Sequence, residues 1–261
     1  MATLVSFHAH PDDESIATGG VLAKAAAEGH RVVFVFATRG ENGEYPDDFL
    51  DPGEELGDRR VRETLAAAQI LGSHRVEWLG YRDSGMVDTD TNNDSRSFWR
   101  ADVEEAATKL AAILTEESAD VLTIYDAAGG YGHPDHVQVH RVGRRAAEIA
   151  GIARVYEATM NRDHFVRLLR SAKDAGVDIP DLPDPDDLGD FGVSEDEITT
   201  AVDVSAFIDV KRRAMAAHAS QIPENSMFLT MPEPVFLATW GTEWFVREDA
   251  PVGLREASLF D

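Results

Sequence analysis

Near its N-terminus the chain reads Leu4-Val5-Ser6-Phe7-His8-Ala9-His10-Pro11-Asp12-Asp13-Glu14. The apolar residues that open this stretch predict a buried strand over Thr3–His8. One imidazole and three carboxylates then follow closely, where the strand gives way to a helical pattern. Histidine and carboxylate side chains are ligands that divalent metals take in proteins. The stretch therefore predicts a metal-binding turn at the end of the first strand.

A second cluster of the same kind follows another apolar run. The residues Tyr131-Gly132-His133-Pro134-Asp135-His136 come shortly after a predicted strand, Val121–Tyr125. In open α/β sheets, ligands gather beyond the carboxyl ends of the strands. We expect the two loops to close on one ion, and hydrolysis at a divalent metal is the leading hypothesis.

The rest of the first 160 residues alternates short apolar runs with longer helical patterns. Such alternation predicts βαβ units and an α/β fold, with a mostly parallel sheet flanked by helices. The further strands predicted are Arg31–Thr38, Val76–Leu79, Arg154–Ala158 and Thr199–Val204, and the helices are Ile16–Glu28, Asp58–Leu71, Asp102–Glu117, Val137–Ala150 and Ser205–Ala219. The Pro- and Asp-rich segment Gly176–Gly192 is predicted to be a solvated loop, and the stretch around Trp240 and Trp244 gives no clear pattern.

Composition limits the classes of function. The net charge of −24 argues against nucleic acid as a partner, because phosphate binding needs clustered basic residues. Without cysteine there is no disulfide or thiolate zinc site. No membrane span or signal peptide is apparent, so we expect a cytoplasmic protein. We predict a single domain over 1–261, with a catalytic core at about 1–160 and a variable part at about 161–261.

A catalytic zinc commonly takes three protein ligands and keeps one position for water. His10 and Asp13 from the first cluster and His136 from the second fit this number, and Asp12 is then left as the general base. Spacing alone leaves two alternatives open: Asp12 and Asp13 with exchanged roles, or a ligand role for Glu14. A purely structural interpretation of the first cluster is that its carboxylates stabilise a helix N-terminus as anions.

The second cluster also offers groups that act on the substrate. His133 is expected near the metal without binding it, and Asp135 is expected to orient His133 and favour its imidazolium. An imidazolium there would stabilise the oxyanion and protonate the leaving amine. Tyr131 is predicted to donate its hydroxyl to the same oxygen.

Both clusters resemble the LmbE-like, or PIG-L, family of zinc-dependent N-deacetylases. The resemblance rests on Ala9-His10-Pro11-Asp12-Asp13-Glu14 and His133-Pro134-Asp135-His136, and it extends over most of the chain. Thr38–Gly43, Arg60–Glu63, Lys211, His218–Gln221 and Gly241–Phe245 are similar to other family segments, while Arg82–Met86 and Tyr131 resemble the mycothiol-pathway deacetylase and amidase branch.

The resemblance implies a Rossmann-like three-layer fold. It makes His10, Asp13 and His136 the metal ligands, Asp12 the base, and His133 with Asp135 and Tyr131 the remaining catalytic set. Arg60, Asp83 and Glu41 are then expected to bind the substrate. The implied cofactor is Zn²⁺, with Fe²⁺ as the alternative ion in the cell.

The implied activity is removal of the N-acetyl group from an N-acetylglucosamine-type conjugate by attack of a metal-bound water. The alternatives are an amidase that cleaves a larger acyl group from a glucosamine-inositol substrate, and a non-catalytic sugar-binding protein. The expected partner is a small amino-sugar conjugate, and a homo-oligomer stays an open alternative. Nothing suggests an NAD enzyme, because the first turn lacks Gly-x-Gly-x-x-Gly.

Overall fold

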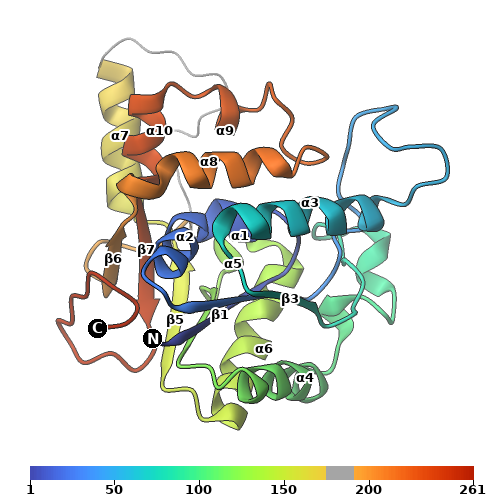
Figure 1. The fold of residues 1–261 in the computed structure, drawn as a ribbon, viewed down its shortest axis with the longest axis horizontal. Coiled ribbons are helices and arrows are strands. Elements are labelled where there is room, and N and C mark those ends of the chain that lie inside the picture. The colour runs from blue at the N-terminus through green and yellow to red at the C-terminus, as the bar shows by residue number, and fades with distance from the viewer. Residues whose placement is uncertain (175–190) are drawn as a thin grey trace.

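The computed structural model describes residues 1–174 and 191–261, in which a seven-stranded sheet lies between two layers of helices (Figure 1). The strand order is β3-β2-β1-β4-β5-β7-β6. The strands are β1 (Thr3–His8), β2 (Arg31–Phe36), β3 (Arg75–Trp78), β4 (Val121–Tyr125), β5 (Arg154–Thr159), β6 (Thr200–Asp203) and β7 (Thr242–Arg247). The predicted loop Gly176–Gly192 lies almost wholly outside the described residues.

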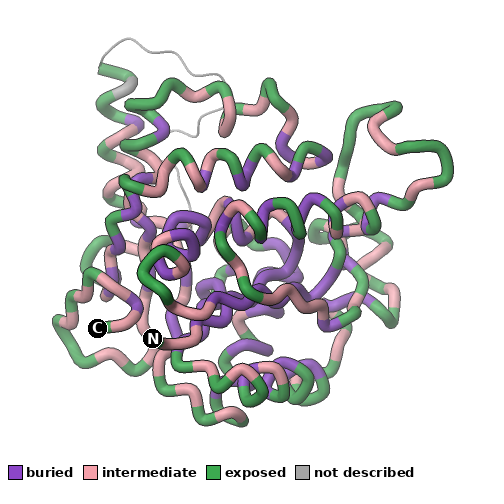
Figure 2. The backbone as a smooth tube through the Cα atoms, in the orientation of Figure 1, coloured by how far each residue is buried: buried purple, intermediate pink, exposed green. Residues whose placement is uncertain are grey.

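Strands β1 to β5 are all parallel, as the alternation of strands and helices predicts. β1 pairs with β2 from Thr3↔Arg31 onward and with β4 from Leu4↔Val121 onward. The central strands are apolar along nearly their whole length because both faces of the sheet are covered. Figure 2 shows the resulting band of buried residues through the middle of the molecule.

The two edges of the sheet differ. β7 runs antiparallel to β5 and to β6, so the last strand of the chain lies between two earlier ones. The sequence pattern predicts β6 but not β7, whose alternation is weak. The C-terminal part therefore extends the same sheet that carries the two histidine clusters.

Helices cover the two faces in separate groups. α4 (Val103–Glu116) and α6 (Pro134–Ala150) pack on one face, where their apolar stripes meet β1, β2 and β4. α2 (Gly19–Ala27) and α3 (Leu56–Leu71) pack on the other face, and α8 (Ile208–Ala217) packs on α2 and α3 (Figure 1). This is the expected three-layer arrangement.

Several predicted helices differ in their bounds. The pattern Ile16–Glu28 is two helices, α1 (Asp13–Ala17) and α2, because Thr18 leaves the helical conformation and its hydroxyl donates to the carbonyl of Glu14. Ser205–Ala219 divides into a 3₁₀ turn, Ser205–Phe207, and α8. The remaining elements are α5 (Gly129–Gly132), α7 (Arg162–Asp174), α9 (Met227–Thr230), α10 (Glu233–Trp240) and two 3₁₀ turns, Asp90–Asn93 and Phe98–Arg100.

The order of strands fixes where a ligand can bind. From β1 the chain proceeds to β2 and β3 on one side, and it returns to β4 on the other side. The carboxyl ends of β1 and β4 thus form the topological switch point, where α/β sheets bind their ligands. Both histidine clusters follow these two strands. No helix of the described residues is long and apolar enough to cross a membrane.

Candidate active site

The first cluster forms a tight turn between β1 and α1. The carbonyl of Asp12 accepts hydrogen bonds from the backbone N–H groups of Ser15 and Ile16, each at 3.0 Å, and these bonds start the helix. Asp12 itself has φ 95°, a conformation that an L-aspartate rarely adopts. The turn places Asp12 and Asp13 side by side beyond the carboxyl end of β1, at the switch point.

The three predicted metal ligands come together. Oδ2 of Asp13 lies 3.5 Å from Nδ1 of His10 and 3.4 Å from Nε2 of His136. The backbone N–H of His10 also donates to Oδ2 of Asp13 at 2.9 Å. Ring nitrogens of His10, His133 and His136 lie within 4.8 Å of one another. A pair of imidazoles and a carboxylate converge on one point.

One ring nitrogen of this set lacks a hydrogen-bond partner in the part of the chain that the structure describes. Nε2 of His136 is buried and has no hydrogen-bond partner among the described residues. Buried polar atoms normally have a partner, and a neutral imidazole nitrogen facing a carboxylate is a typical metal ligand. Burial raises the pKa of Asp13, but His136 and His10 outweigh burial and hold that pKa well below its usual value. The donor set therefore fits a divalent ion.

A second group of acids lies on the other side of His10. Nε2 of His10 is 3.2 Å from Oδ2 of Asp135 and 3.5 Å from Oδ1 of Asp83. The Asp135 carboxylate also accepts the backbone N–H of Ser84 at 2.9 Å and the Ser84 hydroxyl. Burial acts to lower the pKa of His10, but the three neighbouring aspartates raise it well above 6.5. Asp135 thus orients the proposed ligand His10.

The expectation for Asp135 and His133 needs correction. The Asp135 carboxylate does not face His133; instead the backbone N–H of Asp135 donates to Nδ1 of His133 at 3.1 Å, as part of the cap of α6. When Nδ1 of a neutral imidazole accepts a hydrogen bond, the ring proton is on Nε2. Burial lowers the pKa of His133 to about 4, helped by the nearby His10 and His136. These contacts and this lowered pKa favour a neutral His133 that donates from Nε2 over the expected imidazolium.

Arg60 also departs from its expected place. It is expected to bind the substrate, but at 3% exposure its side chain is buried and directed to protein groups. Its guanidinium lies 3.3 Å from Oδ2 of Asp12 and donates to the carbonyls of Gly40, at 2.8 Å, and of Pro11. A Cβ at Gly40 would overlap this guanidinium, so the residue there must be glycine. Arg60 thus holds the carboxylate of Asp12.

Asp83 and Glu41 belong to one loop assembly beside the site. Asp83 is buried, and its carboxylate accepts the backbone N–H groups of Asn42 at 3.1 Å and of Gly85 at 2.8 Å. Glu41 accepts the backbone N–H of Asp83 at 3.1 Å. The loop that follows β2 and the loop that follows β3 are therefore joined beside His10.

Other acidic and imidazole groups near the site have different partners. Both side-chain oxygens of Glu14 point away from the cluster, which rules out a ligand role for it in this conformation. His8 bonds Ser6 and the Tyr125 hydroxyl, and His140 bonds the Tyr125 carbonyl at 3.1 Å. Neither His8 nor His140 contacts the expected metal ligands His10, Asp13 and His136.

Comparison with known proteins agrees with this geometry. Residues 5–147 match the model of the PIG-L family, described as GlcNAc-PI de-N-acetylase. The chain belongs to the PIG-L family. Members of this family are metal-dependent deacetylases, so the chain is a hydrolase of that class.

Relatives in the family extend along nearly the whole chain. Proteins named 1D-myo-inositol 2-acetamido-2-deoxy-alpha-D-glucopyranoside deacetylase are similar to it. The protein from Acidothermus cellulolyticus is 40% identical and covers 94% of this chain and 88% of its own length. The one from Nocardiopsis dassonvillei is 43% identical, covering 82% of this chain and 83% of its own length.

Solved structures show the same fold at lower identity. N,N'-diacetylchitobiose deacetylase from Pyrococcus horikoshii has a TM-score of 0.61 at 22% identity, covering 94% of this chain and 83% of that one. A deacetylase from the teicoplanin biosynthesis pathway has a TM-score of 0.63 at 19% identity, covering 96% and 100%. These likenesses support the PIG-L fold.

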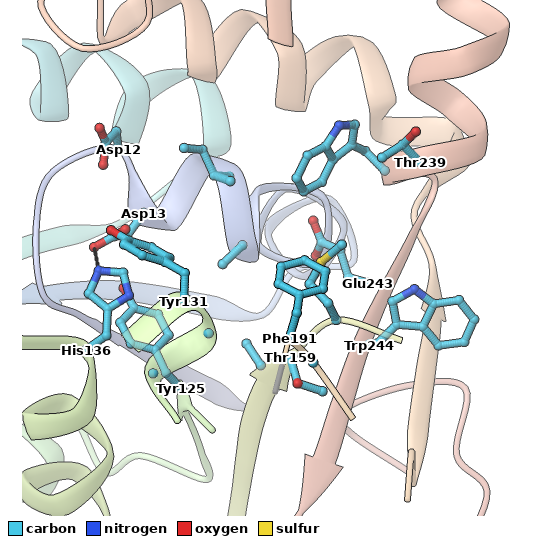
Figure 3. A pocket seen from close by; sticks show the side chains of 18 of the residues that line it. Asp12, Asp13, Tyr125, Tyr131, His136, Thr159, Phe191, Thr239, Glu243 and Trp244 are labelled. Carbon is cyan, nitrogen blue, oxygen red and sulfur yellow. Dashed lines mark ion pairs between the residues drawn. The ribbon is translucent and has the colours of Figure 1, made fainter. Parts of the chain in front are cut away.

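In this PIG-L chain a cavity of about 410 Å³ opens beside Asp13 and His136. Asp12, Asp13 and His136 lie at one end of it, and Figure 3 shows Trp244 and Thr239 at the other. Tyr131 lines the cavity beside Asp13 and His136 (Figure 3), with 61% of its surface exposed. Apolar side chains make up most of the wall: Ile16, Ala17, Ala158, Met160, Phe191, Phe228, Trp240 and Trp244.

Sequence reasoning missed much of this wall. Glu243 and Lys211 line the cavity as a buried ion pair at 2.5 Å, and Glu243 also accepts the backbone N–H groups of Gly20 and Val21 at 2.7 Å. Only the resemblance to family segments pointed to Lys211 and Glu243, without a role. Their charges are used to anchor β7 and α8 to the start of α2.

Proposed function

We propose that this protein removes the acetyl group from an N-acetylglucosaminyl-inositol conjugate by hydrolysis of the amide. The relatives named above act on such a conjugate by their names, and they match nearly the whole chain. The observation that carries the proposal is the buried, partnerless Nε2 of His136 facing Asp13, with Asp12 in the adjoining position.

His10, Asp13 and His136 would hold the ion, which we propose to be Zn²⁺, with Fe²⁺ as the alternative. Two imidazoles and one carboxylate suit either ion. When bound, the ion would polarise the acetamide carbonyl and make a water molecule more acidic. Asp135 and Asp83 keep the ring of His10 oriented toward that position.

Asp12 acts as the general base. Burial raises the pKa of Asp12 to about 6, although Arg60 favours the charged form. A carboxylate with such a pKa is mostly ionised at pH 7 and still accepts a proton readily. Asp12 takes a proton from the attacking water and delivers it to the amide nitrogen as the C–N bond breaks, which leaves acetate and a free amine.

His133 stabilises the charge that develops on the carbonyl oxygen. Its neutral ring presents Nε2–H, because Nδ1 is used as an acceptor. Preorganised donors of this kind stabilise an oxyanion without cost at the moment of reaction. Tyr131 at the cavity mouth is the second candidate donor, and Asp83 and Glu41 remain the candidates for binding sugar hydroxyls.

The direct test is release of acetate from N-acetylglucosaminyl-inositol by the purified protein loaded with Zn²⁺. We expect turnover that chelation abolishes and that added Zn²⁺ restores. N-acetylglucosamine without the inositol is the matched substrate control, and it should react more slowly. Absence of acetate release from both compounds would contradict the proposal.

A second candidate function is hydrolysis of larger acyl groups, which the names of the relatives do not favour but for which the apolar cavity beside Asp13 offers space. The polar loops around Asp83 suit the amino sugar, so the acyl group would extend to the opposite side, into the apolar cavity. A series of N-acetyl, N-butyryl and N-hexanoyl substrates tests this. If the cavity takes the chain, KM should fall by about fourfold for each added CH₂ that is buried, and Ala17→Leu should remove this gain while leaving acetyl hydrolysis in place.

A further inference from the structure

A buried pair of side chains lies directly behind the turn that carries the base. Nε2 of His218 is 2.6 Å from Oε1 of Glu14, and both side chains have no exposed surface. Oε2 of Glu14 accepts the backbone N–H of Asp12 at 2.9 Å. We infer that His218 is a positioning residue for the reaction: through Glu14 it holds the backbone of Asp12 in the conformation that aims the base. This inference rests on the proposed function.

The conformation of Asp12 requires such support. Its φ of 95° lies outside the region that an aspartate prefers, so the turn would relax if nothing held it. Two side chains hold it. Arg60 binds the Asp12 carboxylate and the carbonyl of Pro11, while Glu14 binds the Asp12 N–H.

Glu14 can serve as an anchor only if its other oxygen is satisfied. That oxygen accepts the Ser15 hydroxyl at 2.7 Å and faces Nε2 of His218. An anionic carboxylate with no exposure and no counter-charge would be costly, and Asp12 and Asp13 add further negative charge nearby. His218 offers its Nε2–H to this oxygen.

The place of His218 in the fold explains how it can do this. It follows the last residue of α8, a helix that packs on α1, α2 and α3. Two residues later, the backbone N–H and hydroxyl of Ser220 donate to Glu63 of α3 at 2.9 and 2.6 Å. His218 lies outside the cavity wall, so it acts through Glu14 and not on the substrate.

The test compares two substitutions of similar volume. His218→Gln keeps an N–H donor that can reach Glu14, whereas His218→Met keeps the bulk and removes the donor. We expect His218→Met to lower kcat by tenfold or more, with KM and bound metal unchanged, because a displaced base loses rate. His218→Gln should restore kcat to within about threefold of the starting protein.

Ser220→Ala is the matched control, because it removes the neighbouring hydroxyl bond to Glu63 without touching the Asp12 turn. It should lower Tm and leave kcat unchanged. Equal losses of kcat in the Gln and Met variants, or a loss in Ser220→Ala as large as in His218→Met, would overturn the inference.

A second readout does not depend on activity. Hydrogen–deuterium exchange of the peptide spanning residues 9–16 should be slow in the starting protein and in His218→Gln, and faster in His218→Met. If exchange follows this order while no substrate is turned over, the positioning role stands and the proposed function fails. Identical exchange in all three proteins would overturn the positioning role.

Discussion

Oδ2 of Asp13 lies 3.4 Å from Nε2 of His136, although one residue follows β1 and the other lies on α6. The adjacent strands β1 and β4 bring them together across the switch point of the sheet. The two neighbouring aspartates therefore have different partners: Asp13 faces the imidazoles, and Asp12 faces Arg60.

The first prediction distinguishes the ligands from the base. His136→Ala should lose most of its bound metal, because it removes one of three protein ligands. Asp12→Asn should retain the metal and lose about 10²–10⁴-fold in kcat, because only proton transfer is lost. Metal analysis and steady-state kinetics on the two proteins check this. Loss of metal from Asp12→Asn would mean that Asp12 and Asp13 have exchanged roles.

Arg60 should control the pH dependence of the base. Arg60 favours the ionised form of Asp12, so Arg60→Met should raise the pKa of Asp12 above about 6. The acidic limb of kcat/KM would then move to higher pH, and activity at pH 6 would fall more than activity at pH 8. Arg62→Met is the matched control, because Arg62 is exposed on the same helix and pairs with Glu54. An acidic limb that stays in place would contradict this role.

His133 should contribute to rate without setting the basic limb. Burial lowers the pKa of His133 to about 4, so the ring is neutral throughout the working range. His133→Ala should reduce kcat by about 10²–10³-fold, the usual loss for an oxyanion donor, with the metal retained. The shape of the pH profile between pH 7 and 9 should be the same in both proteins. A basic limb that disappears in His133→Ala would restore the imidazolium interpretation.

A prediction about stability concerns Glu157 on β5. Burial raises the pKa of Glu157 to about 7, and the nearby Glu248 raises it further than Arg144 lowers it. The folded protein therefore binds a proton that the unfolded chain releases near pH 4.5, and stability is lost as pH rises from there to about 7. Glu157→Gln should remove up to about 3 kcal/mol of this dependence. Urea unfolding at pH 5 and pH 8 measures the free energy of unfolding of each protein. The same change in this free energy between the two pH values in both proteins would refute the prediction.

The sequence predicts those parts of the fold and site that depend on local pattern. β1 and β4 have the predicted bounds, and each histidine cluster follows its strand, because strand, turn and helix signals occur within a few residues. The parallel order of β1 to β5 follows from the intervening helices. The family and the class of hydrolase follow from the same two clusters.

Other parts depend on contacts between distant segments. Asp135 is close to His133 in sequence, but its position in the first turn of α6 points its carboxylate to Ser84. No local pattern reveals that direction. For Arg60 a signal exists: it lies on the same helical face as the buried Ala67 and Leu71, which predicts an inward side chain. The cavity wall and the His218–Glu14 pair come from chain segments that meet only in the folded state.

The order of strands at the sheet's edge has a consequence for synthesis on the ribosome. β6 pairs with β7 and, at Thr200, with Glu256, and both partners are made after it. β5 likewise waits for β7 along one side. Until β7 has emerged, β5 and β6 lack the strand that joins them. Completion of the sheet is therefore delayed until β7 leaves the exit tunnel, and premature termination upstream of β7 would release a protein with an open β-edge that invites aggregation.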